Sequence, residues 1–425
     1  MTPNRRHVRA LSLLLAMLAA PAAADELAIV GARVYAAPDA APLDDATIVL
    51  RDGRIAAVGP RATVKLPRSA KVIDAHGMVA TAGFWNSHIH LITPPYHLPQ
   101  EQPAPALSTA LHEQYTRWGF TTLFDIASLP GDVLALRQRI VRGEVTGPRL
   151  LTVDMPFYPE HGTPIYVRDL WEKYQVPSAE IATPEQGRER AAKQLDAGAD
   201  GVKLFTGAIV GGEQRVLDMP VAVGKAVVDE AHARHKPAFA HPTDTGGLTA
   251  ALDSGVDVLA HTAPDAGDWS PALLARLKRQ HVALIPTLTL FESEPRRQGA
   301  PEPVVVRFVG QAQRQLKAAS DAGVDVLFGT DAGYIEIFDT HREYQLMAAA
   351  GLDWRQILAS LTTTPARRFG DPAHEGRLAP GMAADLVLLG GDPALAADAF
   401  ADVRLTVRAG KVIHEAAAAP SGIEH

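Results

Sequence analysis

The sequence predicts an α/β fold, a (β/α)₈ TIM barrel with a small β-sandwich domain built from both chain ends. Two observations lead to this prediction. Between residues 79 and 332, eight apolar, strand-like runs alternate with helical stretches, as in parallel strands joined by helices. On either side of this region, short strand-like runs with glycine turns lie too close together for such units, so we expect them to share one small sheet.

The composition limits the possible functions. The 425-residue chain is long enough for one large and one small domain, and its hydrophobic fraction of 47% is ordinary for a globular protein. A net charge of −7 without a Lys/Arg block argues against nucleic acid as a partner. The absence of cysteine excludes disulfides, thiolate metal ligands and a cysteine nucleophile. Any bound metal must therefore be held by His, Asp, Glu or a modified Lys.

The first 24 residues are typical of a cleaved signal peptide. Three arginines precede an eleven-residue apolar run at 10–20, and alanines at 22–24 form a small-residue cleavage site. The run is too short for a membrane anchor, since a spanning helix needs about 20 apolar residues. The sequence thus predicts a periplasmic or secreted protein with no membrane contact after the signal peptide is removed.

The remaining segments follow in chain order. We expect the N-terminal part of the sandwich at 25–78, the barrel at 79–368, the C-terminal part of the sandwich at 369–415 and a tail at 416–425. The expected barrel strands are 79–90, 120–127, 149–155, 200–206, 237–243, 257–263, 283–290 and 324–332. The expected helices include 105–119, 131–144, 184–198, 220–235, 270–281 and 302–322, several of which start near a proline and end at a glycine.

Metal-capable side chains stand at the ends of several of these strands. His88 and His90 lie two residues apart on the first strand, so both point to the same side. Later strands end in Lys203, His241, His261 and Asp331. The carboxyl ends of barrel strands meet at one face, where barrel enzymes place their catalytic groups. Because buried charges are costly unless they are paired or bind a metal, these six residues together predict a metal centre.

Lys203 is the unusual member of this set. An ammonium group would repel a divalent cation, whereas a neutral lysine can add CO₂ and offer two carbamate oxygens that bridge two ions. Burial lowers the pKa of a lysine and so permits this reaction. The alternative is an ordinary ion pair of Lys203 with Asp331 or Asp200.

Six motifs carry a resemblance to a known family. They are GFWNSHIH (83–90), DGVKLFT (200–206), FAH (239–241), LAH (259–261), GTDAG (329–333) and GRLAPGMAADLVLL (376–389). The chain resembles the amidohydrolase superfamily, in the lysine-bridged binuclear branch with imidazolonepropionase-like and Xaa-Pro dipeptidase-like hydrolases. The resemblance implies that His88, His90, His241 and His261 bind two divalent ions, most often zinc. It also implies that N6-carboxylated Lys203 bridges the ions and that Asp331 is both ligand and catalytic base.

Three positions depart from the family pattern. Asn86 stands where the family often has an aspartate, two residues before the first histidine. The segment 206–212 (TGAIVGG) replaces the SGG-type segment that follows the lysine in dipeptidase-like members, and residues 262–264 follow the last histidine where glycine is common. These changes leave the metal ligands intact and concern the parts that contact substrate. Lys203 itself argues against imidazolonepropionase activity, which uses a single ion.

The predicted function is that of an exported metal-dependent hydrolase that cleaves an amide or peptide C–N bond with a metal-activated hydroxide. The same site could instead hydrolyse a lactone or carboxylic ester. A third alternative, an exported binding protein without activity, is disfavoured by the intact ligand set. The expected partners are a small-molecule substrate and, in a homo-oligomer, further copies of the chain.

Substrate contacts are expected from the long aromatic loop at 154–169, since such loops position substrates in barrels. The candidates are Tyr158, His161, Tyr166 and Arg168 in this loop, and His341 after the last strand. Of these, His161 or Tyr166 could donate a hydrogen bond to a substrate carbonyl oxygen. Ordinary packing is the alternative for each of them.

Overall fold

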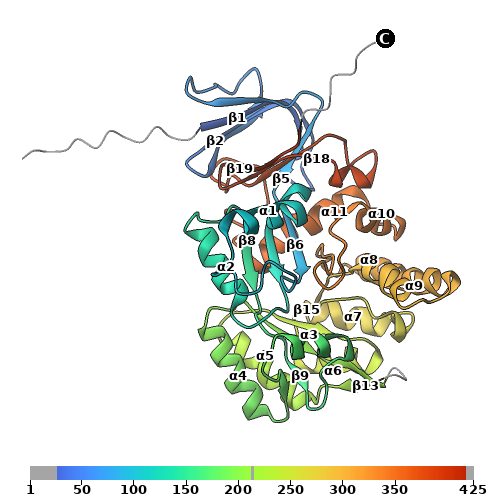
Figure 1. Cartoon of the computed structure of the whole chain (residues 1–425). Helices are drawn as coiled ribbons and strands as arrows, with labels where there is room; N and C mark the ends of the chain where they lie inside the picture. The colour runs from blue at the N-terminus through green and yellow to red at the C-terminus, as the bar shows by residue number, and fades with distance from the viewer. Residues whose placement is uncertain (1–25, 212–214, 418–425) are drawn as a thin grey trace, which may run out of the picture.

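The computed structural model describes residues 26–211 and 215–417, so the predicted signal peptide at 1–24 lies outside the described residues. These residues form a mixed sheet and a larger α/β region. In Figure 1 the sheet lies at the top, where the blue strands β1, β2 and β5 meet the red strands β18 and β19. The α/β region lies below it.

Both chain ends contribute to the mixed sheet. Its order is β19-β18-β17-β5-β1-β2-β3, and β4 pairs with β1. The strands are β1 (Glu26–Val34), β2 (Leu43–Arg51), β3 (Arg54–Pro60), β4 (Lys71–Asp74), β5 (Val79–Ala82), β17 (Leu386–Leu389), β18 (Val403–Arg408) and β19 (Lys411–Glu415). The junction is β5, which pairs parallel with β1 and antiparallel with β17. All eight strands lie in one sheet, so the two-layered sandwich stays a prediction.

The α/β region is built on two parallel sheets. One has the order β6-β7-β8 and the other β11-β14-β15-β16. Their bounds are β6 (Phe84–Ile89), β7 (Phe120–Asp125), β8 (Arg149–Thr152), β11 (Val202–Phe205), β14 (Ala238–His241), β15 (Val258–Leu259) and β16 (Ala283–Leu284). Backbone hydrogen bonds connect the sheets: the N–H of Phe157 donates to Lys203, and the N–H of Ser87 donates to Phe328. Side chains of six such segments share a small interior core, which includes Phe124, Phe239 and Leu327.

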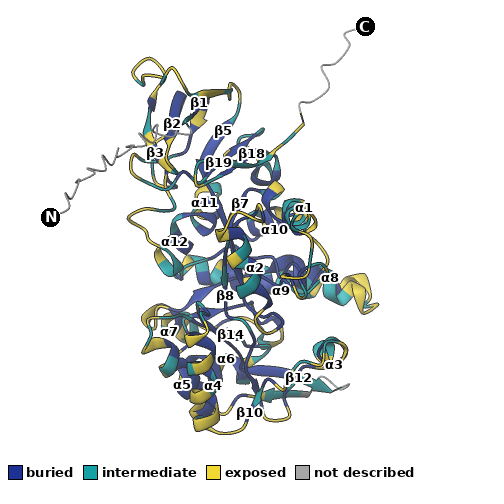
Figure 2. Ribbon diagram, turned by 60° about the vertical axis from the view of Figure 1, so that its left-hand side comes forward, coloured by how far each residue is buried: buried dark blue, intermediate teal, exposed yellow. Residues whose placement is uncertain are grey.

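Helices follow most of these strands. They are α1 (Ala104–Gln114), α2 (Asp132–Val141), α3 (Arg168–Lys173), α4 (Pro184–Asp196), α5 (Val221–His232), α6 (Thr245–Ser254), α7 (Pro271–Arg279), α8 (Leu288–Arg297), α9 (Glu302–Asp321), α10 (His341–Ala349), α11 (Trp354–Leu361) and α12 (Thr363–Phe369). Figure 2 shows buried strands inside and exposed residues on the outer faces of α4, α5 and α7. In the part of the chain that the structure describes, no helix is both long and apolar enough to cross a membrane.

Short elements complete the chain. The strands β9 (Tyr158–Pro159) and β10 (Glu180–Ile181) pair in parallel, and β12 (Gly207–Gly211) and β13 (Arg215–Asp218) form an antiparallel pair. Four 3₁₀ turns are η1 (Thr116–Trp118), η2 (Ile165–Val167), η3 (Pro264–Ala266) and η4 (Ala397–Ala401).

The predicted first strand, 79–90, is wrong as a single element. The chain divides it into β5, in the mixed sheet, and β6, in the parallel sheet, with Gly83 between them. The Gly83 N–H donates to Asp385, and a Cβ on Gly83 would collide with the side chain of Thr121. A glycine therefore lets one continuous apolar run serve two sheets.

The last two predicted strands are also shorter than expected. The run 283–290 is a strand only at β16, because Thr287 adopts a left-handed conformation (φ 45°) that turns the chain into α8. Within 324–332 the structure has isolated parallel bridges at Val326 and Ala332 in place of a strand. These bridges nevertheless attach the segment to β16 on one side and to β6 on the other.

Candidate metal centre and active site

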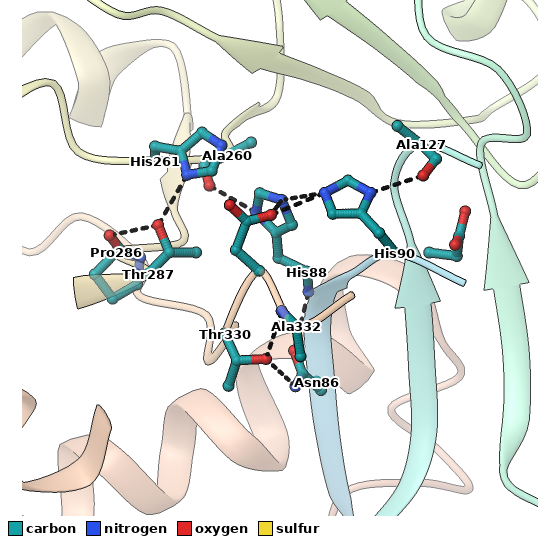
Figure 3. Close-up of polar contacts among 12 residues, drawn as sticks. Asn86, His88, His90, Ala127, Ala260, His261, Pro286, Thr287, Thr330 and Ala332 are labelled. Carbon is teal, nitrogen blue, oxygen red and sulfur yellow. Dashed lines mark hydrogen bonds and ion pairs between the residues drawn. The ribbon is translucent and has the colours of Figure 1, made fainter. Parts of the chain in front are cut away.

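The structure brings the ligands predicted from separate strands to one place. Nε2 of His88 and Nε2 of His90 lie 3.0 and 2.8 Å from Oδ1 of Asp331. The two Nε2 atoms are 3.2 Å apart. His88, His261 and Asp331 each place a ligand atom within 4.8 Å of the others, and Figure 3 shows His88, His90 and His261 converging.

Hydrogen bonds on the far side of each ring determine which nitrogen faces the centre. Nδ1 of His88 donates to the carbonyl of Ala260 (2.8 Å), and Nδ1 of His90 donates to the carbonyl of Ala127 (2.7 Å). Burial lowers the pKa of His88 to about 4, so this ring is neutral near pH 7. With its proton on Nδ1, Nε2 of a neutral ring carries a lone pair.

His261 is oriented in the same way by Thr287. The Thr287 hydroxyl donates to the carbonyl of Pro286 (2.9 Å), so its oxygen can only accept the hydrogen bond from Nδ1 of His261 (2.8 Å). Nε2 of His261 is therefore also free of a proton. Burial lowers the pKa of His261 well below its ordinary value, which keeps the ring neutral.

The arrangement of these acceptor atoms shows whether the site is suited to a metal ion. Oδ1 of Asp331 is buried and receives no hydrogen bond from any described residue, although the Nε2 atoms of His88 and His90 lie within 3.0 Å of it. Acceptor atoms repel one another at such distances unless a cation is shared among them. Imidazole nitrogens and carboxylates are ligands of zinc-like ions. The residues present thus fit a divalent metal.

Lys203 and His241 extend the centre. Lys203 is 1% exposed on β11, and burial lowers the pKa of its amine to about 7. His241, at the end of β14, stacks on Phe205 with the ring centroids 4.7 Å apart, and burial lowers its pKa to about 3. Its ring lies 4.6 Å from that of His261, centroid to centroid. Both side chains are suited to the neutral state that metal binding or carbamate formation requires.

The ion-pair alternative for Lys203 finds little support among the described residues. Asp200 pairs with Arg137 (2.6 Å) and Lys236 (3.5 Å). Asp331 places Oδ1 against the imidazoles of His88 and His90 instead. No carboxylate of the described chain lies within ion-pair distance of the Lys203 amine.

Asp331 occupies a strained position. Its φ of 60° is left-handed, which is uncommon for a residue other than glycine. Burial raises the pKa of its carboxyl, but His88 and His90 together hold the pKa well below the ordinary value. Two residues later, Gly333 (φ 103°) approaches the carbonyl of His90 so closely that a Cβ would overlap it. The GTDAG motif therefore holds an ionised carboxylate against β6.

Two polar residues behind the ligands were not predicted as site residues. Asp125, at the end of β7, accepts the Leu91 N–H through Oδ2 (2.7 Å) and so fixes the chain just after His90. Burial raises its pKa to about 6. Thr287 orients His261, as described above. Asp125 could have been found by the strand-end rule applied to the other ligands, whereas Thr287 carries no such signal.

Asn86, which replaces the aspartate common in the family, contributes to the support of the ligands. Its side-chain amide donates to the Thr330 hydroxyl (2.8 Å), and its carbonyl accepts the N–H of His88 (3.2 Å). It thus connects β6 to the segment that carries Asp331. An amide can make both bonds at once, because it offers a donor and an acceptor.

A cavity of about 320 Å³ opens next to the ligands. Its lining includes His90, Lys203, His241, His261 and Asp331. Of the predicted substrate contacts, Tyr158 and Tyr166 also line it. The hydroxyl of Tyr166 lies in surroundings that raise its pKa well above the ordinary value, mainly through burial, so it is a hydrogen-bond donor at neutral pH.

The structure does not bring the other three predicted contacts to this cavity. The His161 side chain is exposed, and its backbone N–H donates to Glu180. Arg168 is exposed and donates to the carbonyls of Thr163 and Val210. His341 pairs with Asp339 on the surface, at the start of α10. The sequence showed these residues near the right strand ends, but their directions depend on the path of the loops.

One wall of the cavity comes from helices that the sequence did not connect with the site. It includes Leu290, Phe291 and Glu294 of α8 and Val304 and Phe308 of α9. The expected strand at 283–290 hid this contribution, because it placed Leu290 in a sheet. The amphipathic pattern of 302–322 showed an apolar face without showing what it contacts.

Parallel strands whose carboxyl ends hold converging His, Asp and Lys side chains are the arrangement of metal-dependent enzymes on TIM-barrel folds. The profile of the amidohydrolase family matches residues 79–413, and the chain belongs to that family. The family prediction is thus confirmed.

Individual relatives agree with this assignment. An adenine deaminase from Rubrobacter xylanophilus is 26% identical over 387 residues, which are 87% of this chain and 54% of that protein. This chain thus spans about half the length of that relative. An enamidase from Eubacterium barkeri is 35% identical over 82 residues, 19% of this chain and 20% of that protein.

Solved structures support the predicted fold class. A candidate prolidase from Bifidobacterium longum has a TM-score of 0.75 at 26% identity, covering 91% of this chain and 94% of that one. A Xaa-Pro dipeptidase with bound methionine has a TM-score of 0.78 at 17% identity, covering 92% and 100%. The chain therefore has a TIM-barrel-type α/β fold with an additional domain.

Proposed function

We propose that this protein is a metal-dependent hydrolase that cleaves a C–N bond at a carbonyl carbon. The observation that carries the proposal is the meeting of Asp331 Oδ1 with two imidazole Nε2 atoms inside a cavity large enough for a small molecule. Membership of the amidohydrolase family and the likeness to prolidase and deaminase relatives agree with it.

Different residues of the site would bind the metal ions and transfer the proton. His88, His90, His241, His261 and Asp331 would hold two divalent ions, with zinc proposed as the native metal and carboxylated Lys203 as the bridge. When bound, such ions supply Lewis acidity, which polarises a carbonyl and makes water a stronger nucleophile near neutral pH. Asp331, ionised and in contact with the centre, accepts a proton from the attacking water and returns it to the leaving nitrogen.

Tyr166 is proposed to assist at the carbonyl. It lines the cavity, and its phenol keeps its proton at neutral pH, so it can donate a hydrogen bond to developing negative charge on the carbonyl oxygen. Tyr158 lies 4.9 Å from Phe205, centroid to centroid, and its role is to shape the cavity.

Finer features of the predicted architecture remain proposals as well. We propose that the two parallel sheets close into one eight-stranded barrel, which the hydrogen bonds from Phe157 to Lys203 and from Ser87 to Phe328 support. A two-layered sandwich for the chain ends, export from the cytoplasm, a small-molecule substrate and a homo-oligomer are proposed on the sequence alone.

Substitution of Asp331 tests the function. Asp331→Asn keeps the size of the side chain and a weak ligand oxygen, but it cannot accept a proton. We expect metal content close to wild type and a fall in kcat by roughly 10²–10⁴-fold on an amide substrate. Elemental analysis and turnover of a panel of N-acyl amino acids, dipeptides and lactones measure both quantities.

The panel also separates the competing functions. Turnover of lactones with no turnover of any amide would replace the proposal by a lactonase. Undiminished amide turnover by Asp331→Asn would show that another group accepts the proton. No metal uptake by the wild type would remove the basis of the mechanism.

A further inference from the structure

Aromatic rings extend from the metal ligands along the cavity. On one side, Phe205 stacks on His241 and contacts Tyr158, with centroid distances of 4.7 and 4.9 Å. On the other side, Phe291 meets the ring of His261 edge-on at 6.2 Å and packs against Phe308 at 5.6 Å. The apolar surface therefore begins where the bond to be cleaved must lie.

The wall formed by α8 and α9 is almost free of unpaired charge. Glu294, which lines the cavity, forms an ion pair with Arg297 at 2.6 Å. Its neighbours on this wall are Leu290, Phe291, Val304 and Phe308. A ligand that covers such an apolar surface binds with a more favourable free energy, whereas a small ligand leaves part of the surface in contact with water.

We propose that the site is selective for amides that carry a large aromatic or branched apolar group directly beside the scissile bond. The group packs between Phe291 and Phe308 on one side and Phe205 and Tyr158 on the other. This inference rests on the proposed C–N hydrolase function and adds the substrate class to it. Leu290 and Val304 complete the surface that the group covers.

Phe308 is the residue that most directly tests the proposal. It lies on α9, outside the metal ligands, and contacts the cavity through the same face that packs on Phe291. Val306, two residues earlier on the same helix, is 59% exposed and does not line the cavity. Phe308→Ala and Val306→Ala therefore remove apolar atoms from the same helix on different faces.

The experiment measures kcat and KM of the metal-loaded enzyme on matched amides. The compounds are glycylglycine, phenylalanylglycine and glycylphenylalanine, and the corresponding acyl series N-acetylglycine, N-benzoylglycine and N-acetylphenylalanine. Within each series the charge is constant, while one side of the scissile bond changes from small to aromatic. We expect kcat/KM to be higher by roughly 10–100-fold for at least one aromatic member over its small counterpart.

The variants localise this preference. Phe308→Ala is expected to lower the ratio of kcat/KM for aromatic over small compounds about tenfold. The change should come mainly from a higher KM for the aromatic compounds, because an apolar wall stabilises bound substrate and transition state alike. The metal content of this variant should stay at the wild-type level, and its loss of kcat/KM on the small compounds should be smaller than that on the aromatic ones. Val306→Ala should match the wild type on every compound.

The outcomes separate this inference from the proposed function. If aromatic and small amides are hydrolysed with kcat/KM values within about threefold, the substrate class is wrong while the function stands. An equal loss on aromatic and small amides in Phe308→Ala would likewise overturn the role of this wall. If the metal-loaded enzyme hydrolyses no amide of either kind, the proposed function fails and this inference fails with it.

Discussion

At the scale of single residues, the centre depends on the partners of its histidines. Each of His88, His90 and His261 directs Nδ1 to an acceptor on another segment, which leaves Nε2 for the centre. Such partners fix the tautomer and the direction of a ligand ring, and their loss commonly weakens metal binding. The residues on which metal binding depends therefore include these hydrogen-bond partners as well as the side chains that would touch the metal.

Lys203 is the residue whose chemistry is most open to test. Lys203→Ala is expected to lose one of two metal ions and nearly all turnover, because no group replaces the bridging carbamate oxygens. Short carboxylic acids in solution are expected to restore part of both. Lys203→Arg should also lack the second ion and nearly all turnover, since a guanidinium stays protonated and cannot add CO₂.

Metal analysis together with ¹³C NMR in labelled bicarbonate provides the measurement. Lys236→Ala, which removes a surface lysine paired with Asp200, is the matched control and should keep both ions. Retention of two ions and near-normal turnover by Lys203→Arg would show that Lys203 is an ordinary cation and that the bridge is absent.

At the scale of elements, the start of α8 organises one side of the site. The N–H groups of Leu288 and Thr289 donate to the buried carboxyl of Glu343 from α10, at 2.8 and 2.7 Å. This carboxyl satisfies two of the free donors at the start of the helix. It thereby holds Thr287 in its left-handed conformation, and Thr287 orients His261.

Glu343 gives this element a measurable pH dependence. Burial raises the pKa of Glu343 from 4.5 to about 7, so the folded protein binds an extra proton between these values. The stabilising contribution of this proton is complete below pH 4.5 and is lost as the pH rises through 7.

Glu343→Gln should remove this dependence at a cost of about 1–3 kcal/mol, because the amide nitrogen faces a backbone donor. The free energy of unfolding from urea titrations at pH 5 and pH 7 measures the effect. The advantage of the wild type over Glu343→Gln should be larger at pH 5. Glu185→Gln on the exposed side of α4 controls for the loss of one charge, and a constant difference at both pH values would refute the assignment.

At the scale of the whole molecule, the two chain ends meet in one sheet above the α/β region. The strand β5 connects them, and the next strand, β6, carries His88 and is directly followed by His90. A substitution in β5 of the mixed sheet therefore lies only a few residues from two of the candidate ligands. The segment at 1–24 precedes this sheet in the chain.

Export is the prediction that belongs to this scale. Protein isolated from the producing cell is expected to start near Asp25, because the arginines, the short apolar run and the alanines at 22–24 form a signal-peptide pattern. N-terminal sequencing of protein from the periplasmic or culture fraction provides the measurement. Recovery of an intact Met1 from the cytoplasmic fraction would contradict it.

The sequence by itself predicted the TIM-barrel-type fold class and the candidate ligands that the structure brings together. Strand-end residues such as His88, His241 and Asp331 can be read from local patterns, because apolar runs and their polar ends are properties of contiguous segments. The same reasoning applied to 120–127 would have found Asp125. The family resemblance implied a bridging role for Lys203, which the chemistry of a buried lysine already permits.

Only the tertiary structure decided which other residues face the cavity. Thr287, Phe291 and Phe308 reach the site because the chain turns at 287 and because α8 packs on α9. His161 and His341 have suitable chemistry and stand near the right strands, yet His161 is exposed in its loop and His341 pairs with Asp339 at the start of α10. The directions of loop side chains depend on long-range contacts and on backbone conformations that no nearby residue pattern specifies.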